Sequence, residues 1–379
     1  MAVSSDEQDT VISMANKRAE LEQRRVAEQD RESRRRMEGG AEPPKPWLTY
    51  TLIGLNVAVW LVMVGVGVDA FEPAADQLLA WGGNLGVQTT HGQWWRLLTA
   101  TFIHAGIMHL AFNMYFMWAI GRITEQVFRP AGYALLYFGS GLIASLVSVA
   151  WQPMVVSVGA SGALFGVFGG FLGFTIRRRE LLPPEFVRSV RRNALVLIGI
   201  NLAISFMVPN IDIAAHIGGL LAGLGIGYGV AMLAERPVQS REEGVALQRK
   251  VVAMMSVAVA VVLVAGILGV PRYDDVFATF DRVIALNEKA FIAVNTAEGD
   301  EARARAIETV SLPAVESMQA ELAGLERVPK DTRDKVDALK RYADLTHQAF
   351  EHELKGLRTN DPIELLEAKR LHEEADRQP

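Results

Sequence analysis

Apolar stretches alternate with polar ones through the middle of this 379-residue chain. A helix crosses a bilayer with roughly 20 apolar residues, in a range of about 17–25, and several stretches approach that length. The pattern therefore predicts an all-α, polytopic membrane protein with seven transmembrane helices. The predicted spans cover residues 47–67, 106–121, 132–151, 159–176, 194–209, 216–234 and 251–270.

Basic residues are concentrated in alternate loops between these spans. Lys and Arg accumulate in cytoplasmic loops of membrane proteins. We therefore predict a cytoplasmic N-terminus, and the seventh span then places the C-terminus outside. Basic residues number nine in 1–46, two in 122–132, six in 177–192 and four in 235–250, whereas 68–95, 152–158 and 210–215 contain none.

Polar segments flank the membrane region. Residues 1–46 are predicted to form a basic cytoplasmic arm without the pattern of a cleavable signal peptide. A six-helix core over 47–234 is followed by a cytoplasmic linker over 235–250 and by the seventh span over 251–270. The last predicted domain, outside the membrane, is a helical region over residues 271–379, which contains 16 basic and 23 acidic side chains.

The segment 271–379 has helical periodicity and is predicted to form a soluble helical bundle or hairpin outside the membrane. Pro313, Pro329 and Pro362 are expected to separate its helices. Coiled-coil association is an alternative, but no heptad pattern persists through the prolines. The segment is a candidate for recruiting substrates or another extracytoplasmic partner, or for a role in stability or oligomerisation.

The chain has no cysteine and a net charge of −5. The absence of cysteine excludes disulfides and thiolate metal sites, and we expect no metal or other cofactor. The mild charge gives no sign of nucleic-acid binding. A nucleophile in this chain must therefore be Ser, Thr, Lys or a carboxylate.

Polar side chains inside membrane spans are costly unless paired or hydrated, so they are candidates for function. Ser161 in VGASGALFG is predicted to open a helix, where free backbone N–H groups favour negative charge. A structural serine bonded to its own helix is the alternative. The polar residues at predicted span depth are Arg96, His104, His109, Asn113, Ser161, Asn201 and His216.

A serine nucleophile needs a base, and His216 enters the membrane from the same predicted side as Ser161. Gly219 and Gly223 follow it in a GxxxG pattern that permits close helix contact. We expect this helix to pack against a small face formed by Gly159, Gly162 and Gly166. Such packing would bring His216 Nε2 within hydrogen-bond reach of Ser161 Oγ.

His109 and Asn113 are spaced i, i+4, so they share one helix face. Both can donate hydrogen bonds to a developing oxyanion near Ser161. A zinc helix is the competing interpretation, but Asn stands where a second His would be needed and no HExxH occurs.

Three further residues are interpreted as structural. His104 is expected to bond a loop near the outer surface. Trp95 is expected to anchor the membrane interface, and Arg96 to bond carbonyl groups of the 68–95 loop.

These motifs together resemble those of the rhomboid family of intramembrane serine proteases. The resemblance covers about 47–234, and the seventh span resembles the six-plus-one arrangement of a subset of rhomboids. It is carried by WWRLLTATFIHAGIMHLAFNM (94–114), GASGALFG (159–166) and AHIGGLLAG (215–223).

The resemblance implies roles for the candidate residues. Ser161 would be the nucleophile and His216 its base, in a dyad without aspartate. His109, Asn113 and the Ser161 backbone N–H would form the oxyanion hole. Gly159 would keep the site open, and Phe165 stands where many members have a tyrosine that packs on the histidine.

The substrate class implied is another transmembrane protein, in the lipid bilayer of what we expect to be a bacterial inner membrane. A catalytically inactive rhomboid-like binding or chaperone protein remains an alternative. A transporter or channel is disfavoured because no internal repeat of the polar motifs is visible. Neither the substrate nor its cleavage motif is readable from the sequence.

Overall fold

The computed structural model describes residues 45–192, 196, 199, 212–234 and 240–378. Most of the predicted 194–209 span, with Asn201, lies outside the described residues, as does nearly all of the predicted N-terminal arm. The described elements are all helices, and the one β-bridge among them pairs Asn84 with Ser157. The fold is an all-α polytopic membrane protein.

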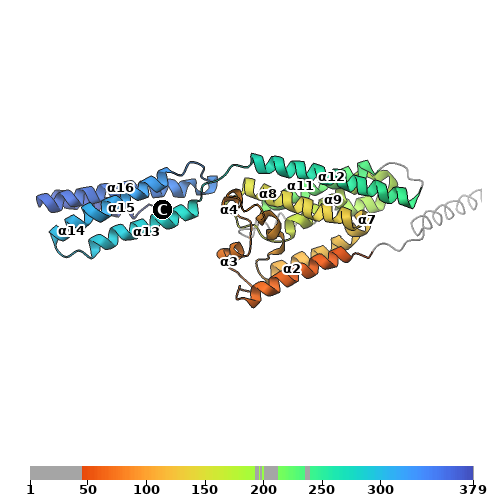
Figure 1. Cartoon of the computed structure of the whole chain (residues 1–379), viewed down its shortest axis with the longest axis horizontal. Coiled ribbons are helices and arrows are strands. Elements are labelled where there is room, and N and C mark those ends of the chain that lie inside the picture. Colours follow the sequence, from red (N-terminus) through yellow and green to blue (C-terminus); the bar gives the residue numbers. More distant parts are fainter. Residues whose placement is uncertain (1–44, 193–195, 197–198, 200–211, 235–239, 379) are drawn as a thin grey trace, which may run out of the picture. The chain divides into compact units, whose positions relative to one another are not determined.

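The described membrane region begins with helix α2 (Trp47–Gly65), followed by short helices in a long loop (Figure 1). Four helices in the described ranges are long and apolar enough to span a bilayer, and the shorter α9 is also apolar. The loop helices are α3 (Ala75–Ala80), α4 (Gly86–Thr90), α5 (Arg96–Thr99) and η1 (Ala100–Phe102). The later helices of this region are α9 (Ser161–Arg177), η4 (Arg179–Leu181), α11 (Ile213–Leu233) and α12 (Arg241–Gly269).

Two predicted spans are joined into a single helical path from Ile107 to Trp151. Arg129, with φ 59° and ψ 167°, breaks the helical geometry immediately before Pro130. Proline disfavours the α conformation in the residue that precedes it, and a kink at Arg129 separates the two helices without an intervening loop. The elements along this path are α6 (Ile107–Phe116), η2 (Met117–Gly121), α7 (Arg122–Ala134), η3 (Leu135–Gly139) and α8 (Ser140–Trp151).

One element boundary differs from the expectation. Helix α12 begins at Arg241, ten residues before the apolar segment, because the polar residues 241–250 continue the same helix. The described part of the predicted linker 235–250 is therefore mostly helical. The first helix after the long loop begins at Ile107, after the 3-10 turn η1, one residue from the start of the predicted 106–121 span.

Helices α9 and α11 pack with their backbones in close contact. A Cβ atom built on Gly219 would overlap the carbonyl oxygen of Gly162, and one on Gly223 would overlap that of Gly166. Close backbone approach of this kind requires small residues at the interface. The expected glycine packing is present for Gly162 and Gly166, but Gly159 lies in the preceding loop and contributes nothing to it.

The start of α2 is held by a buried carboxylate. Glu125 of α7 accepts hydrogen bonds from the backbone N–H groups of Leu48 and Thr49, at 3.0 and 2.8 Å, and from Thr49 Oγ1 at 2.7 Å. The first N–H groups of a helix have no partner within it. Glu125 therefore caps α2 and ties it to α7.

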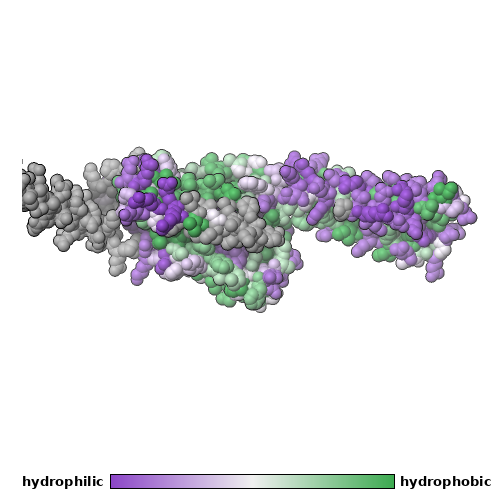
Figure 2. Space-filling view, turned by 180° about the vertical axis from the view of Figure 1, so that it is seen from behind, coloured by the Kyte–Doolittle hydropathy of each residue, from purple (hydrophilic) through white to green (hydrophobic). Residues whose placement is uncertain are grey.

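The C-terminal segment forms a helical bundle, in which α13, α14, α15 and α16 lie side by side (Figure 1). Its core contains Val283, Ala290, Met318 and Phe350. On the face shown in Figure 2, this bundle is mainly hydrophilic, whereas the membrane helices expose large apolar areas. Its elements are α13 (Val276–Asn295), α14 (Asp300–Ala306), η5 (Ile307–Ser311), α15 (Leu312–Ala323), η6 (Lys330–Thr332), α16 (Arg333–Thr359) and α17 (Pro362–Ala375).

The three prolines of this segment act differently from one another. Pro329 and Pro362 lie between helices, as expected. Pro313 does not separate helices, because the chain stays helical from Asp300 to Ala323. Pro313 has no backbone N–H to donate within a helix. The wider π-helical turn Ile307–Ser311 just before it lets the helix continue without that hydrogen bond.

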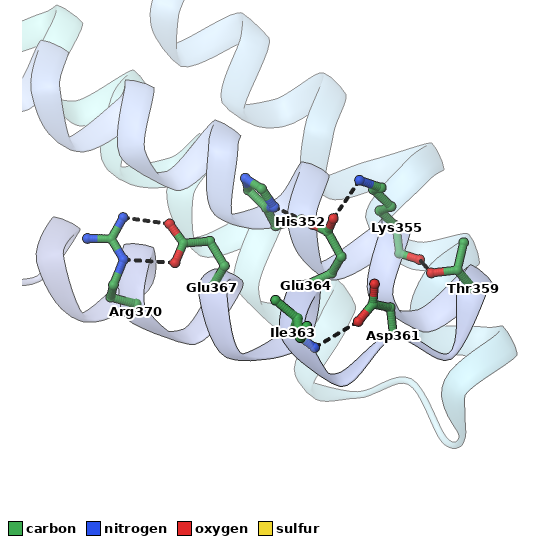
Figure 3. Close-up of polar contacts among 8 residues, drawn as sticks. All are labelled: His352, Lys355, Thr359, Asp361, Ile363, Glu364, Glu367 and Arg370. Atoms are coloured by element: carbon green, nitrogen blue, oxygen red, sulfur yellow. Dashed lines mark hydrogen bonds and ion pairs between the residues drawn. The ribbon is translucent and has the colours of Figure 1, made fainter.

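Helices α16 and α17 are joined by charged contacts (Figure 3). Glu364 of α17 accepts from Lys355 and His352 of α16, and the two contacts hold the pKa of Glu364 below its ordinary value of 4.5. Glu353 of α16 pairs with Arg303 at 2.7 Å and with His372 at 3.7 Å. Burial raises the pKa of Glu353, but His372 and Arg303 outweigh burial and leave that pKa lowered.

These two lowered pKa values predict acid sensitivity of the α16–α17 pair. Both carboxyl groups bind a proton more readily when unfolded, so their stabilisation is complete above pH 4.5. It is lost as the pH falls through the lower folded pKa values. Hydrogen exchange of the full-length protein should show the protection of α16 and α17 falling between pH 7 and about pH 3.5.

Glu353→Gln provides the control for this experiment. At pH 7 the variant loses charged hydrogen bonds, and we expect the free energy of opening to fall by about 1–3 kcal/mol. Between the two pH values it should then lose less protection than the wild type, because one titrating carboxyl is gone. Equal protection of wild-type α16 at both pH values would contradict the prediction.

Candidate active site

Ser161 and His216 meet at the same end of the α9–α11 pair. Ser161 is the first residue of α9, and His216 lies in the first turn of α11. His216 Nε2 is 2.8 Å from Ser161 Oγ. The glycine contacts described above bring the two backbones together, so two side chains 55 positions apart in the sequence form one hydrogen bond.

The His216 ring is also held by an aromatic neighbour. The Phe165 ring stacks on it with a centroid distance of 4.5 Å and an interplanar angle of 24°. Phe165 lies one turn after Ser161 on the same helix, so α9 supplies both the hydroxyl group and the ring that orients its partner. With Nε2 unprotonated, the Ser161 hydroxyl donates to His216, which is the arrangement of a nucleophile and a general base.

A second group of donors converges beside Gly159. The N–H of Ala105 donates to His109 Nδ1 at 3.3 Å, so that nitrogen is the acceptor and Nε2 carries the hydrogen. Asn113 uses one amide hydrogen on the His109 carbonyl, at 2.9 Å, and keeps the other free. A Cβ atom on Gly159 would lie 2.8 Å from His109 Nε2 and 3.7 Å from Asn113 Nδ2.

Gly159 is therefore required for two reasons. Its φ of +111° is a conformation that side chains other than glycine rarely adopt. The space that a side chain would fill lies within reach of both donors and two residues before Ser161. An oxygen bound there would be within hydrogen-bond distance of His109 Nε2 and near Asn113 Nδ2, so the space is suited to a group that gains negative charge.

The loop that carries Gly159 is fixed by backbone contacts. The Gly159 N–H donates to the Ala100 carbonyl at 2.8 Å, and the Ala160 N–H donates to His104 Nε2 at 3.4 Å. The fully buried His104 ring also contacts the His109 ring edge-on, at 5.2 Å between centroids. His104 thus bonds the loop immediately before Ser161.

Trp95 and Arg96 lie at the start of α5, within the long loop. Arg96 is 7% exposed and donates to the carbonyl groups of Leu79 and Gly83, both at 2.7 Å. Its guanidinium lies 4.7 Å from the centre of the Trp95 ring. The structure places Arg96 where it closes the 68–95 loop, and neither residue contacts the Ser161–His216 pair.

Two contributors to the site were missed by sequence reasoning. Asn84 is 1% exposed, pairs its backbone with Ser157 and donates from Nδ2 to the Ser145 carbonyl at 3.0 Å. Asp212 caps α11, accepting from the Ala215 N–H at 2.8 Å. The only sequence signals were a polar residue in the apolar segment WGGNLGV and an N-cap residue before a helix.

The Rhomboid domain family matches residues 91–233, a range that includes Ser161, His216, His109, Asn113 and Gly159. YdcA of Bacillus subtilis (strain 168) is 33% identical over 184 residues, which cover 47% of this chain and 85% of YdcA. The chain belongs to the rhomboid family.

Other rhomboid relatives come from bacteria and plants. Rhomboid protease GluP of Bacillus subtilis (strain 168) is 35% identical over 179 residues, or 47% of this chain, and the match spans only 34% of GluP. RHOMBOID-like protein 7 of Arabidopsis thaliana is 31% identical over 54% of this chain and 74% of its own length. The family match ends at residue 233, so the C-terminal bundle lies beyond it.

Proposed function

We propose that this rhomboid is an intramembrane serine endopeptidase with Ser161 as nucleophile and His216 as general base. The observation that carries the proposal is the 2.8 Å contact between Ser161 Oγ and His216 Nε2, beside a space faced by the His109 and Asn113 donors. A hydroxyl group with a bound base and adjacent donors is a combination suited to acyl transfer.

The proposed reaction follows from these positions. Ser161 Oγ attacks the scissile carbonyl carbon, and its proton passes to His216 Nε2. The carbonyl oxygen becomes an oxyanion that accepts from His109, Asn113 and the free N–H of Ser161. Protonated His216 then gives its proton to the leaving amine as the C–N bond breaks. A water deprotonated by the same histidine attacks the acyl carbon, the bond between that carbon and Ser161 Oγ breaks, and His216 returns the proton to Oγ.

The loop charges support a specific orientation in the membrane. With the N-terminus cytoplasmic, the Ser161 end of α9 faces the outer leaflet, and the C-terminal bundle lies on the same side. The substrates would be transmembrane proteins cleaved near their outer ends, where a segment with small or helix-breaking residues can unwind into the site. We place the protein in a bacterial plasma membrane, with residues 271–379 as an extracytoplasmic recruitment element.

A serine-directed fluorophosphonate probe tests the proposal on the purified full-length chain. We expect covalent labelling at Ser161, identified by peptide mass spectrometry, and cleavage of a reconstituted transmembrane substrate. Ser161→Ala should abolish both. A folded wild-type protein that neither reacts with the probe nor cleaves any of a panel of transmembrane segments would instead indicate an inactive, binding member of the family.

A further inference from the structure

Asp212 lies one helical turn before His216. It is the N-cap of α11, and its Oδ1 accepts from the Ala215 N–H at 2.8 Å. The His216 N–H donates to the Asp212 carbonyl at 3.3 Å, so the two residues share one side of the first turn. A cap of this kind fixes the direction in which the helix starts and hence the position of His216.

One Asp212 oxygen is not used by the cap. Oδ2 is buried and has no hydrogen-bond partner among the described residues. A serine, asparagine or threonine would cap α11 without placing a second, ionisable oxygen in a buried position, and an unpaired buried carboxylate oxygen is costly. Capping alone therefore does not account for a carboxylate here.

The neighbour that gains from this charge is His216. The partly buried ring becomes an imidazolium when it takes the Ser161 proton, and a charge away from water is unfavourable without a partner. Among the described residues, the titratable groups whose charges act on His216 are Asp212, on its own helix, and His109, on α6. His109 can only oppose a second positive charge, so within the described part of the chain the counter-charge acting on His216 is Asp212.

We propose that Asp212 is a positioning and charge-stabilising residue of the dyad, fixing α11 through Oδ1 and offsetting the His216 imidazolium through Oδ2. The inference rests on the proposed function. Asp212 takes no part in proton transfer, which runs through Ser161 and His216. The role is related to that of the third residue in soluble serine protease triads, but it acts from the helix cap.

Two substitutions at Asp212 separate the cap from the charge. Asn caps helices as well as Asp does, so Asp212→Asn keeps the cap and removes the charge. Asp212→Glu keeps the charge but caps poorly. If the charge acts on catalysis, kcat should fall in the order wild type, Asp212→Glu, Asp212→Asn, while the melting temperature should be lowest for Asp212→Glu.

The expected loss for Asp212→Asn is about 10- to 100-fold in kcat with KM unchanged, and a similar loss in the rate of fluorophosphonate labelling. Asp275 provides a matched control, because it caps α13 through the same bond, to the Ala278 N–H at 3.0 Å. Asp275→Asn should leave kcat unchanged.

Each outcome decides for or against the role of Asp212. Wild-type kcat in Asp212→Asn, or a kcat order that follows the melting temperatures, would overturn it and leave Asp212 as a cap. A kcat order opposite to the stability order supports it. If the wild-type protein itself neither cleaves nor reacts with the probe, the proposed function is overturned instead. The two failures are distinguishable because this one is seen in the wild type, whereas the role of Asp212 is tested by comparing variants with an active wild type.

Discussion

Replacing Ser161 or His216 with alanine is expected to reduce kcat/KM on a transmembrane substrate by about 10⁴-fold or more. Ser161→Ala removes the nucleophile, and His216→Ala leaves the hydroxyl without the base that lies 2.8 Å away. Because the two side chains act as a unit, the double variant should retain as much activity as the less active of the two single variants. The measurement is cleavage of a fluorescent transmembrane peptide in proteoliposomes.

Two residues of the same types serve as controls for this experiment. Ser256 is exposed on α12 and His91 is exposed in the long loop, and neither lies in the site. Ser256→Ala and His91→Ala should retain wild-type cleavage. If Ser161→Ala kept more than about 1% of wild-type activity, or if the two single losses multiplied in the double variant, the dyad would be rejected.

The pairing of Ser161 with His216 was predictable because it depends on topology rather than on detailed packing. Both residues follow loops assigned to the same side, and both are accompanied by glycines at helical spacing. A helix pair with small residues on facing sides can approach closely. The sequence therefore indicates which two helices meet, although it does not give the register at which they meet.

The sequence interpretation was wrong about the position of Gly159, which does not belong to the helix face that packs on α11. Its position near Ser161 suggested a place in the glycine face of the helix, but α9 starts only at Ser161. Gly159 instead adopts φ +111° in the loop, beside His109. A loop conformation depends on distant partners such as Ala100, and short sequence patterns do not report them.

The two missed residues have the same explanation. Asn84 donates a hydrogen bond to the Ser145 carbonyl, 61 residues away in the sequence. A polar residue in a loop is normally expected to be exposed to solvent, so the sequence offered no reason to expect this buried contact. Asp212 appears in the sequence as an ordinary N-cap, and only the buried, unpaired second oxygen in the structure sets it apart from one. By contrast, the bend at Arg129 follows from the adjacent Pro130, a local cause that the sequence does contain.

Gly223→Ala should be among the most damaging single methyl additions in the described part of the chain. The new Cβ would overlap the Gly166 carbonyl oxygen, so α9 and α11 must move apart. Overpacking of this kind costs about 1–3 kcal/mol, occasionally more, and we expect the upper end because a backbone atom is the obstacle. The separation also lengthens the contact between Ser161 and His216, and a displacement of about 1 Å can cost about 10²-fold in rate.

Gly225→Ala, two positions along the same helix, is the matched control. A Cβ there has nothing within 4 Å, and alanine is about 1 kcal/mol more favourable than glycine in a helix. Thermal unfolding in detergent, followed by intrinsic tryptophan fluorescence, should therefore show Gly223→Ala melting well below the wild type and Gly225→Ala at or above it. Similar melting temperatures and activities for the two variants would mean that α9 and α11 are not in backbone contact, and the close approach that joins the dyad would have to be abandoned.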